Sequence, residues 1–190
     1  MVLSRSGPVR SEAAHQAILD AAVALFAERG YDHLTMEGIA RRAGVGKQTI
    51  YRWWPSKGDV LAEAILEGRL LGRERDLPDT GDARRDLATW LNGLFTLRAS
   101  ADGEGLLRSL VAAAAGSAET GRRLRAEILA APLVERLSTA MAGTTGPRLD
   151  AAADALLGAV ILRALSREEF DFDDMLHLVD AVIGTPTPRR

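Results

Sequence analysis

The sequence predicts an all-α protein of about nine helices, and three observations carry that prediction. Apolar residues recur three and four positions apart along most of the chain, which places them on one face of a helix. The alternation of apolar and polar residues that is typical of strands is almost absent. Glycines, prolines and short polar residues fall between the periodic stretches, where helices begin and end.

Two helices are predicted before residue 44. Ser11 is placed to cap the first helix, and Gly30 supplies the left-handed residue that ends it. Thr35 then caps a short second helix. Each helix carries an apolar stripe, formed by Ile18, Ala22, Leu25 and Phe26 in the first and by Met36, Ile39, Ala40 and Ala43 in the second.

Two more helices follow a tight turn at residues 44–46. The third helix begins at Lys47 and ends before Pro55. Ser56 and Asp59 have the spacing of a capping box, so a fourth helix should begin between them. Its apolar pattern predicts that this helix extends to about residue 75.

The later helices come after a linker at residues 77–81. Their apolar spacing places them at residues 82–100, 104–115, 118–142, 150–166 and 173–183, with a second loop at residues 143–147. Pro132 lies inside the third of these segments. It should kink or split that helix, because proline lacks an amide hydrogen and clashes with the preceding turn.

Composition indicates an ordinary globular protein with an uneven charge. Of the 190 residues 47% are apolar and 26% are charged. Residues 1–58 hold 8 Lys and Arg against 5 Asp and Glu, whereas the remainder holds 16 against 21. There are no cysteines, which excludes disulfides. We expect a cytoplasmic protein that does not contact membranes, because no signal peptide and no membrane-spanning apolar run is found.

The third predicted helix has a face that core packing does not explain. At about 100° per residue, Ile50 and Trp54 share the side directed at the first two helices. Gln48 and Arg52 then lie at the centre of the opposite side. Gln and Arg read base edges, and Lys, Thr and Tyr are suited to phosphates. The flanking residues of this face are Lys47, Thr49, Tyr51 and Trp53.

A solvated helix surface is the plain alternative for this face. Two large aromatic side chains beside it disfavour that alternative, and the face indicates a helix that enters the major groove of DNA. Lys57 supports the same interpretation. It stands at the start of the fourth helix, where a cation opposes the helix dipole unless a phosphate binds there.

This part of the chain resembles the TetR family of bacterial transcriptional regulators. The resemblance covers about residues 12–65 and joins an amphipathic AILDAAVALFAERGY helix to TMEGIARRAGVGKQTIYRWWPSKGDVL. The positions that match the family motif are Phe26, Gly30, Tyr31, Thr35, Ile39, Ala40, Gly44, Val45, Tyr51 and Lys57. The chain departs from the motif at Gly46, where the family often has Ser or Thr, and at Trp53-Trp54, where a His or Tyr followed by Phe is usual.

The resemblance implies both a set of DNA contacts and an order of domains. The contacts it implies are Thr35, Lys47, Gln48, Thr49, Tyr51, Trp53 and Lys57. A three-helix DNA-binding domain with a helix-turn-helix would occupy residues 1–58. A connecting helix would occupy residues 59–76, and a helical ligand-binding and dimerisation domain residues 77–190.

Two segments of the C-terminal part are suited to the pairing of protomers. Small residues at positions 151–159 let helices approach closely, and the last helix offers an apolar stripe. Packing inside one protomer is the alternative, but helix-turn-helix proteins read two-fold operators as dimers. The predicted homodimer interface comprises Ala155, Gly158, Ala159, Leu162, Leu176, Val179 and Ile183.

A small-molecule pocket is predicted around the fifth helix, where apolar side chains gather with few polar groups. Its residues would be Trp90, Leu94, Phe95, Arg98, Leu107, Leu110 and Met141, and a plain core is the alternative. No cofactor and no metal are expected. His15, His33 and His177 lie far apart in the sequence and show no i, i+4 pairing.

These features predict a homodimeric repressor that binds a palindromic double-stranded DNA operator and is released by a small-molecule inducer. An enzyme is not expected, because no catalytic triad or Gly-rich phosphate loop is present. Three alternatives stay open. They are an activator without a small-molecule ligand, an enzyme that retains a helix-turn-helix, and an interaction module that binds a partner helix through Tyr51 and Trp53.

Overall fold

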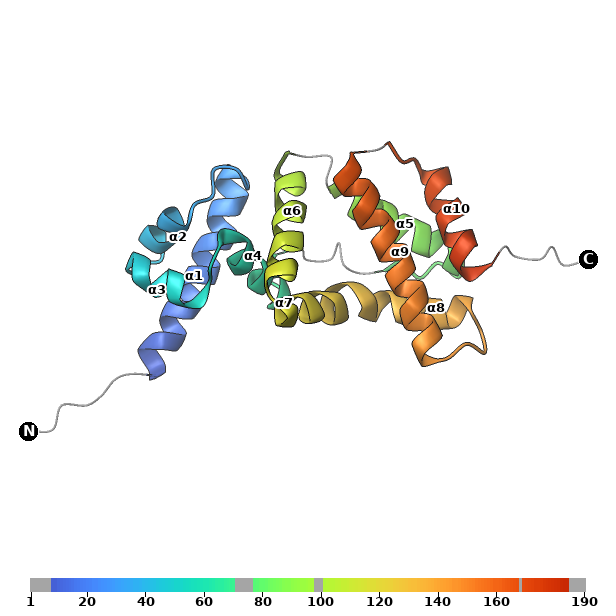
Figure 1. The fold of residues 1–190 in the computed structure, drawn as a ribbon, viewed down its shortest axis with the longest axis horizontal. Helices are drawn as coiled ribbons and strands as arrows, with labels where there is room; N and C mark the ends of the chain where they lie inside the picture. Colours follow the sequence, from blue (N-terminus) through green and yellow to red (C-terminus); the bar gives the residue numbers. More distant parts are fainter. Residues whose placement is uncertain (1–7, 71–76, 98–100, 168, 185–190) are drawn as a thin grey trace, which may run out of the picture. The chain divides into compact units, whose positions relative to one another are not determined.

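Every regular element that the structure describes is helical. The computed structural model describes residues 8–70, 77–97, 101–167 and 169–184, which hold ten α-helices and one π-helical segment. The all-α prediction is therefore confirmed. The chain forms two compact units, one of Met1–Leu70 with Gly105–Gly121 and one of Leu71–Glu104 with Arg122–Arg190 (Figure 1). The domain boundaries at residues 58 and 76 stay a prediction.

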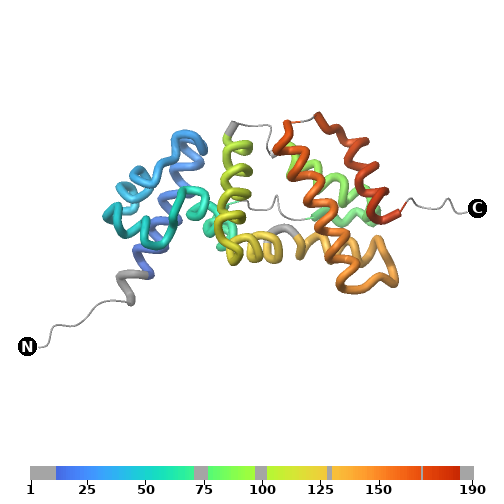
Figure 2. The backbone as a smooth tube through the Cα atoms, viewed as in Figure 1, coloured from blue at the N-terminus to red at the C-terminus, as the bar shows by residue number. Residues whose placement is uncertain are grey.

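The first unit is built around one long helix. Helix α1 (Pro8–Arg29) packs against α2 (Met36–Arg42) and α4 (Lys57–Leu66), and α2 packs against α3 (Lys47–Trp53). Figure 2 shows the short path of the backbone from α2 to α3. The predicted stripe of α1 supplies the core, because Ile18 and Ala22 have no exposed surface. Most of α6 (Ala101–Gly116) belongs to the same unit.

The predicted signals for helix ends hold in this unit, with one exception. The Thr35 hydroxyl caps α2 by accepting a hydrogen bond from the Gly38 amide at 3.0 Å. Ser56 and Asp59 form the predicted capping box of α4, and Gly30 ends α1 with a φ of 75°. Ser11 is the exception, since α1 already begins at Pro8. Proline suits a first turn because its φ is helical and an amide hydrogen at that position would have no acceptor within the helix.

Helix α4 ends much earlier than its apolar pattern predicts. It stops at Leu66 rather than near residue 75, because Gly68 adopts a φ of 72°. The Gly68 amide donates to the Ile65 carbonyl, and the Arg69 amide donates to the Ala64 carbonyl, each at 2.9 Å. These are the two bonds of a Schellman motif, which closes a helix with a left-handed glycine. The prediction that α4 extends to about residue 75 was wrong because it did not take Gly68 as the end of the helix.

Helix α5 lies at the centre of the second unit. Helix α5 (Ala83–Leu97) contacts α8 (Ala131–Ala140), α9 (Gly146–Ser166) and α10 (Phe172–Ile183). Near Pro132 the predicted break takes the form of a change of helix type, because the backbone stays helical from residue 118 to residue 140. Helix α7 (Ala118–Arg123) passes into a π-helical segment, η2 (Leu124–Ala130), before α8 begins. This division accounts for one helix more than the sequence predicts.

Helix α9 begins within the predicted second loop. Its first residue is Gly146, so Pro147 stands in the first turn rather than in a connecting loop. Proline at that position is compatible with a helix for the same reason as Pro8. None of the described helices is long and apolar enough to cross a membrane.

Candidate nucleic-acid interface

The orientation of α3 agrees with the prediction from helical spacing. Ile50 and Trp54 are 0% and 3% exposed, so both point into the first unit. Gln48 and Arg52 are exposed on the opposite side. The side chains that can read base edges therefore face solvent, on a helix fixed from behind by two buried residues.

A network of charges and rings covers one edge of this face. Lys47 Nζ lies 2.6 Å from Glu37 Oε1 and 5.6 Å from the centre of the Tyr51 ring. The hydrogen bond between Lys47 and Glu37 raises the pKa of Lys47 and lowers the pKa of Glu37. Both groups are exposed, so water and salt weaken the pair. A DNA phosphate can therefore compete for Lys47 at little cost.

Trp53 packs against α1 as well as bordering the exposed face. Its ring is half-buried, with its centre 5.6 Å from that of His15 and 5.5 Å from that of Trp54. The Arg52 guanidinium lies 5.5 Å from the Trp53 ring centre. The aromatic residue that the sequence reading assigned to DNA thus has a packing role too.

Trp54 anchors the end of α3 to α4 through a residue that the sequence reading missed. The Trp54 indole donates a hydrogen bond of 2.6 Å from Nε1 to Glu63 Oε2. A buried tryptophan needs an acceptor for its indole N–H. A buried tryptophan in the sequence therefore predicts that an acceptor exists, but it does not identify Glu63 as that acceptor.

Lys57 is held in place by Tyr31. Lys57 Nζ donates to the Tyr31 carbonyl at 2.7 Å and lies 3.9 Å from the centre of the Tyr31 ring. Burial lowers the pKa of Lys57 below its ordinary value. The Tyr31 hydroxyl in turn hydrogen-bonds the hydroxyl of Ser109 on α6.

Close packing secures this contact with α6. A Cβ on Gly105 would lie 2.6 Å from the Tyr31 ring, and one on Gly58 would lie 3.0 Å from the Ser109 carbonyl. Larger side chains at either glycine would push the helices apart. The geometry ties the start of α4, and with it Lys57, to α6.

The start of α3 lacks the side-chain cap that is usual for helices. Gly46 is its N-cap and makes no side-chain hydrogen bond, in agreement with the predicted departure from the family motif. Thr35 is exposed, and its hydroxyl is already engaged in capping α2. Thr49 is half-buried.

The two parts of the chain match two models of one family. The model "Bacterial regulatory proteins, tetR family" matches residues 18–64. The model "Tetracyclin repressor-like, C-terminal domain" matches residues 77–182, which is more than half of the chain. The chain belongs to the TetR family. The predicted resemblance is confirmed, and it extends well beyond residue 65.

Individual TetR-family relatives agree with this assignment. The chain is 37% identical over 111 residues to the uncharacterized HTH-type transcriptional regulator YdeS of Bacillus subtilis, a match that covers 58% of the chain and 54% of YdeS. The chain thus spans about half the length of that relative. It is 27% identical to the HTH-type transcriptional regulator AqdR of Rhodococcus erythropolis over 184 residues, 95% of the chain and 80% of AqdR.

A solved TetR-family structure matches nearly the whole fold. The crystal structure of the transcription regulator SCO0332 superposes with a TM-score of 0.67 at 28% identity, and the match covers 92% of the chain and 99% of SCO0332. The predicted class, a helix-turn-helix transcriptional regulator, is confirmed at the level of the TetR family.

The residues predicted for a TetR-like dimer interface differ in exposure. Ala155, Gly158 and Leu162 are exposed, and Leu162 is 67% exposed. Val179 is fully buried in the second unit, so its side chain packs inside the protomer. It is a core residue rather than a surface residue that a second protomer could contact. The other three, Ala159, Leu176 and Ile183, are half-buried.

The residues predicted for a ligand pocket fall in different parts of the molecule. Trp90 and Phe95 are buried in the second unit, and the Phe95 ring centre lies 5.5 Å from that of Phe170. Leu94 and Met141 are half-buried in the same unit, Leu107 and Leu110 belong to the first unit, and Arg98 lies outside the described residues. The pocket stays a prediction.

Proposed function

We propose that this TetR-family chain is a homodimeric, cytoplasmic repressor. It binds a palindromic double-stranded DNA operator, and a small-molecule inducer releases it. The observation that supports DNA binding most directly is the exposed position of Gln48 and Arg52, opposite the buried Ile50 and Trp54. Residues 1–58 would bind DNA, residues 59–76 would connect, and residues 77–190 would bind ligand and the second protomer.

The side chains of the exposed face have different proposed roles. Gln48 and Arg52 read base edges, because amide and guanidinium groups can form paired hydrogen bonds with them. Phosphates are contacted by the surrounding set, Thr35, Lys47, Thr49, Tyr51, Trp53 and Lys57. Of these, Thr35 would use backbone or methyl contacts, since its hydroxyl caps α2.

Dimerisation places two copies of α3 on one operator. Recognition helices of such dimers enter successive major grooves about 34–36 Å apart. The exposed side chains of Leu162 and Leu165 on α9 support pairing through this helix. An apolar surface of this kind is stabilised when a second protomer covers it.

The response to an inducer would pass through α6. This helix contributes its first four residues to the second unit and its remaining residues to the first. Ser109 on α6 contacts Tyr31, which holds Lys57. A ligand that favours another position of α6 would lower DNA affinity by its difference in affinity for the two states.

The test is a selection of bound sequences from random duplex DNA with the purified protein, followed by affinity measurements between 50 and 200 mM salt. We expect a palindromic site to be enriched and its affinity to fall steeply with salt, because bound phosphates release counterions. An affinity indifferent to salt, with no sequence enriched, would instead favour the interaction module that binds through Tyr51 and Trp53.

A reporter gene placed under the selected site separates repressor from activator. Deleting the regulator should raise expression from this reporter if the chain is a repressor. A fall in expression would favour the activator alternative.

A further inference from the structure

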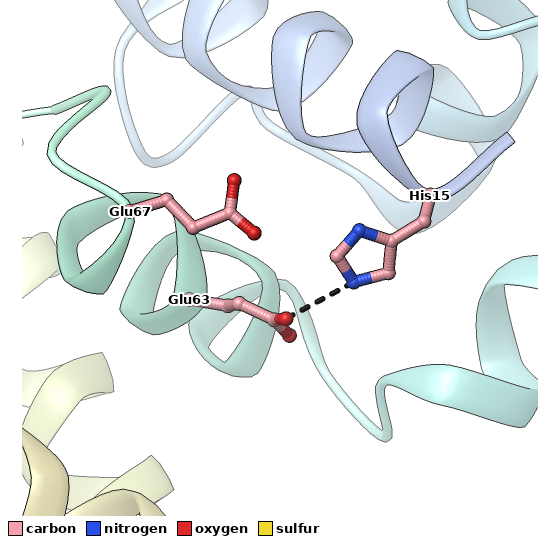
Figure 3. Close-up of side chains that lie close together, drawn as sticks. All are labelled: His15, Glu63 and Glu67. Carbon is pink, nitrogen blue, oxygen red and sulfur yellow. Dashed lines mark hydrogen bonds and ion pairs between the residues drawn. The ribbon is translucent and has the colours of Figure 1, made fainter. Parts of the chain in front are cut away.

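Three potential metal ligands meet where α1 packs against α4. They are His15 of α1, Glu63 of α4 and Glu67, which follows the last residue of α4 (Figure 3). One ligand atom from each lies within 4.8 Å of the other two. His15 Nε2 already donates to Glu63 Oε1 at 3.0 Å. Glu63 and Glu67 are four positions apart, so their carboxylates stand on one face.

The imidazole of His15 is not satisfied by its bond to Glu63. Its Nδ1 atom is buried and has no hydrogen-bond partner. In Figure 3 the ring nitrogen without a dashed line faces the side on which the Glu67 carboxylate lies. Buried polar atoms nearly always have a partner, so an unpaired ring nitrogen beside two carboxylates points to a missing ligand.

Neighbouring donors orient both carboxylates. Trp54 Nε1 donates to Glu63 Oε2 at 2.6 Å, and Arg69 Nε donates to Glu67 Oε2 at 2.8 Å. Arg69 is itself fixed by hydrogen bonds to Gln16 and Asp20. Outer hydrogen bonds of this kind hold metal ligands in position.

We propose that His15 Nδ1 and Glu67 bind one divalent transition-metal ion, with water completing its coordination, while Glu63 orients the imidazole through Nε2. An imidazole nitrogen with a carboxylate suits Zn²⁺ or a similar ion, whereas Mg²⁺ and Ca²⁺ prefer oxygen ligands alone. Metal–ligand bonds of about 2.0–2.2 Å require ligand atoms about 3.3 Å apart. Glu67 is exposed, so its side chain can close the remaining gap.

A bound ion would join two helices beside the recognition helix. The His15 ring centre lies 4.9 Å from that of Trp54, the residue that follows the last residue of α3. The ion would therefore link α1 to α4 next to the anchor of α3. Because it binds the folded protein, it raises the stability of the first unit.

The test uses the full chain without a histidine tag, stripped of metal and titrated with Zn²⁺ and with Co²⁺. We expect one ion per protomer by calorimetry, visible absorption from Co²⁺, and a higher Tm in the presence of Zn²⁺. Glu67→Gln should weaken binding at least tenfold and remove the rise in Tm. It leaves the bonds of Glu63 to His15 and Trp54 in place, so the variant should fold.

His33→Gln is the matched control, because His33 is an exposed histidine of the same unit. It should bind metal like the wild type, whereas His15→Asn should not. Equal affinity in the wild type, Glu67→Gln and His15→Asn would overturn the proposal, as would the absence of saturable binding to the wild type. None of these outcomes depends on DNA binding.

Discussion

Gln48 and Lys57 are proposed to contact the same DNA in different ways. Gln48 is exposed at the centre of the outer face of α3, whereas Lys57 is partly buried against Tyr31. The amide of Gln48 can distinguish bases. The ammonium group of Lys57 can only add charge and one phosphate contact.

Substitution of each residue by alanine should separate the two roles. Gln48→Ala should lose about 1–3 kcal/mol of discrimination at particular base pairs. Lys57→Ala should weaken binding to all sequences alike and reduce the salt dependence by about one phosphate contact. Affinities for the selected site, for its single-base variants and for unrelated DNA measure both effects.

Thermal melting of both variants is the control for these measurements, because Lys57 also contacts Tyr31. Unchanged affinity of folded Lys57→Ala for unrelated DNA would show that its phosphate role is wrong.

The beginning of α3 has no side-chain cap, because its N-cap residue is Gly46. Gly46 has a φ of −71°, which any residue adopts, and a Cβ there would meet only Thr49 Oγ1, at 3.9 Å. A serine at this position has room to cap the helix.

Gly46→Ser should therefore raise the free energy of unfolding by a few tenths of a kcal/mol, since serine caps slightly better than glycine. Chemical denaturation measures the change. Gly44→Ser is the matched control. Gly44 has space around it but a φ of 68°, so the same side chain should cost about 1 kcal/mol there. Equal effects of the two substitutions would contradict this explanation.

Helix α5 is joined to the loop before it by a buried carboxylate. Asp86 is 2% exposed and accepts hydrogen bonds from the Thr80 amide at 2.9 Å and from the Thr80 hydroxyl at 2.7 Å. Burial acts to raise the pKa of Asp86. The bonds from Thr80 and the charge of Arg136 outweigh it, so this pKa lies below its ordinary value.

A lowered pKa means that the folded chain holds the proton of Asp86 less tightly than the unfolded chain does. Asp86 therefore stabilises the fold above about pH 4, and this stabilisation is lost as the pH falls through its folded pKa. We expect Asp86→Asn to lower the Tm at pH 7. On acidification, the Tm of the variant should fall less than the Tm of the wild type. Parallel Tm curves from pH 7 to pH 3 would contradict this prediction.

At the scale of the whole molecule, dimerisation should depend on the outer face of α9. Leu162 is 67% exposed, and a second protomer would bury it. Leu162→Glu should raise the dimer dissociation constant at least about tenfold, because an unpaired carboxylate is costly to bury. Sedimentation or light scattering across a concentration series measures it. Thr139→Glu adds the same charge at another exposed position and should leave the dimer intact.

Local signals predicted most of the elements correctly. Thr35, Ser56 and Pro132 acted on their own helices as their chemistry requires, because caps and breaks depend on residues within one turn. The end of α4 was missed although its signal, Gly68, is also local. The long apolar pattern around that glycine was taken as the stronger indication.

The sequence by itself determined the helical class, the family and the orientation of α3, because periodicity and capping operate over a few residues. The tertiary structure alone decided which residues surround each functional side chain. Tyr31 beside Lys57, Glu63 beside Trp54, and Val179 inside the core are examples. His15 meets Glu63 across 48 positions of sequence. The spacing of the histidines in the sequence argued against a metal site. Spacing reports only on contacts within one helix, because contacts between helices depend on how the chain folds back on itself and leave no periodic pattern.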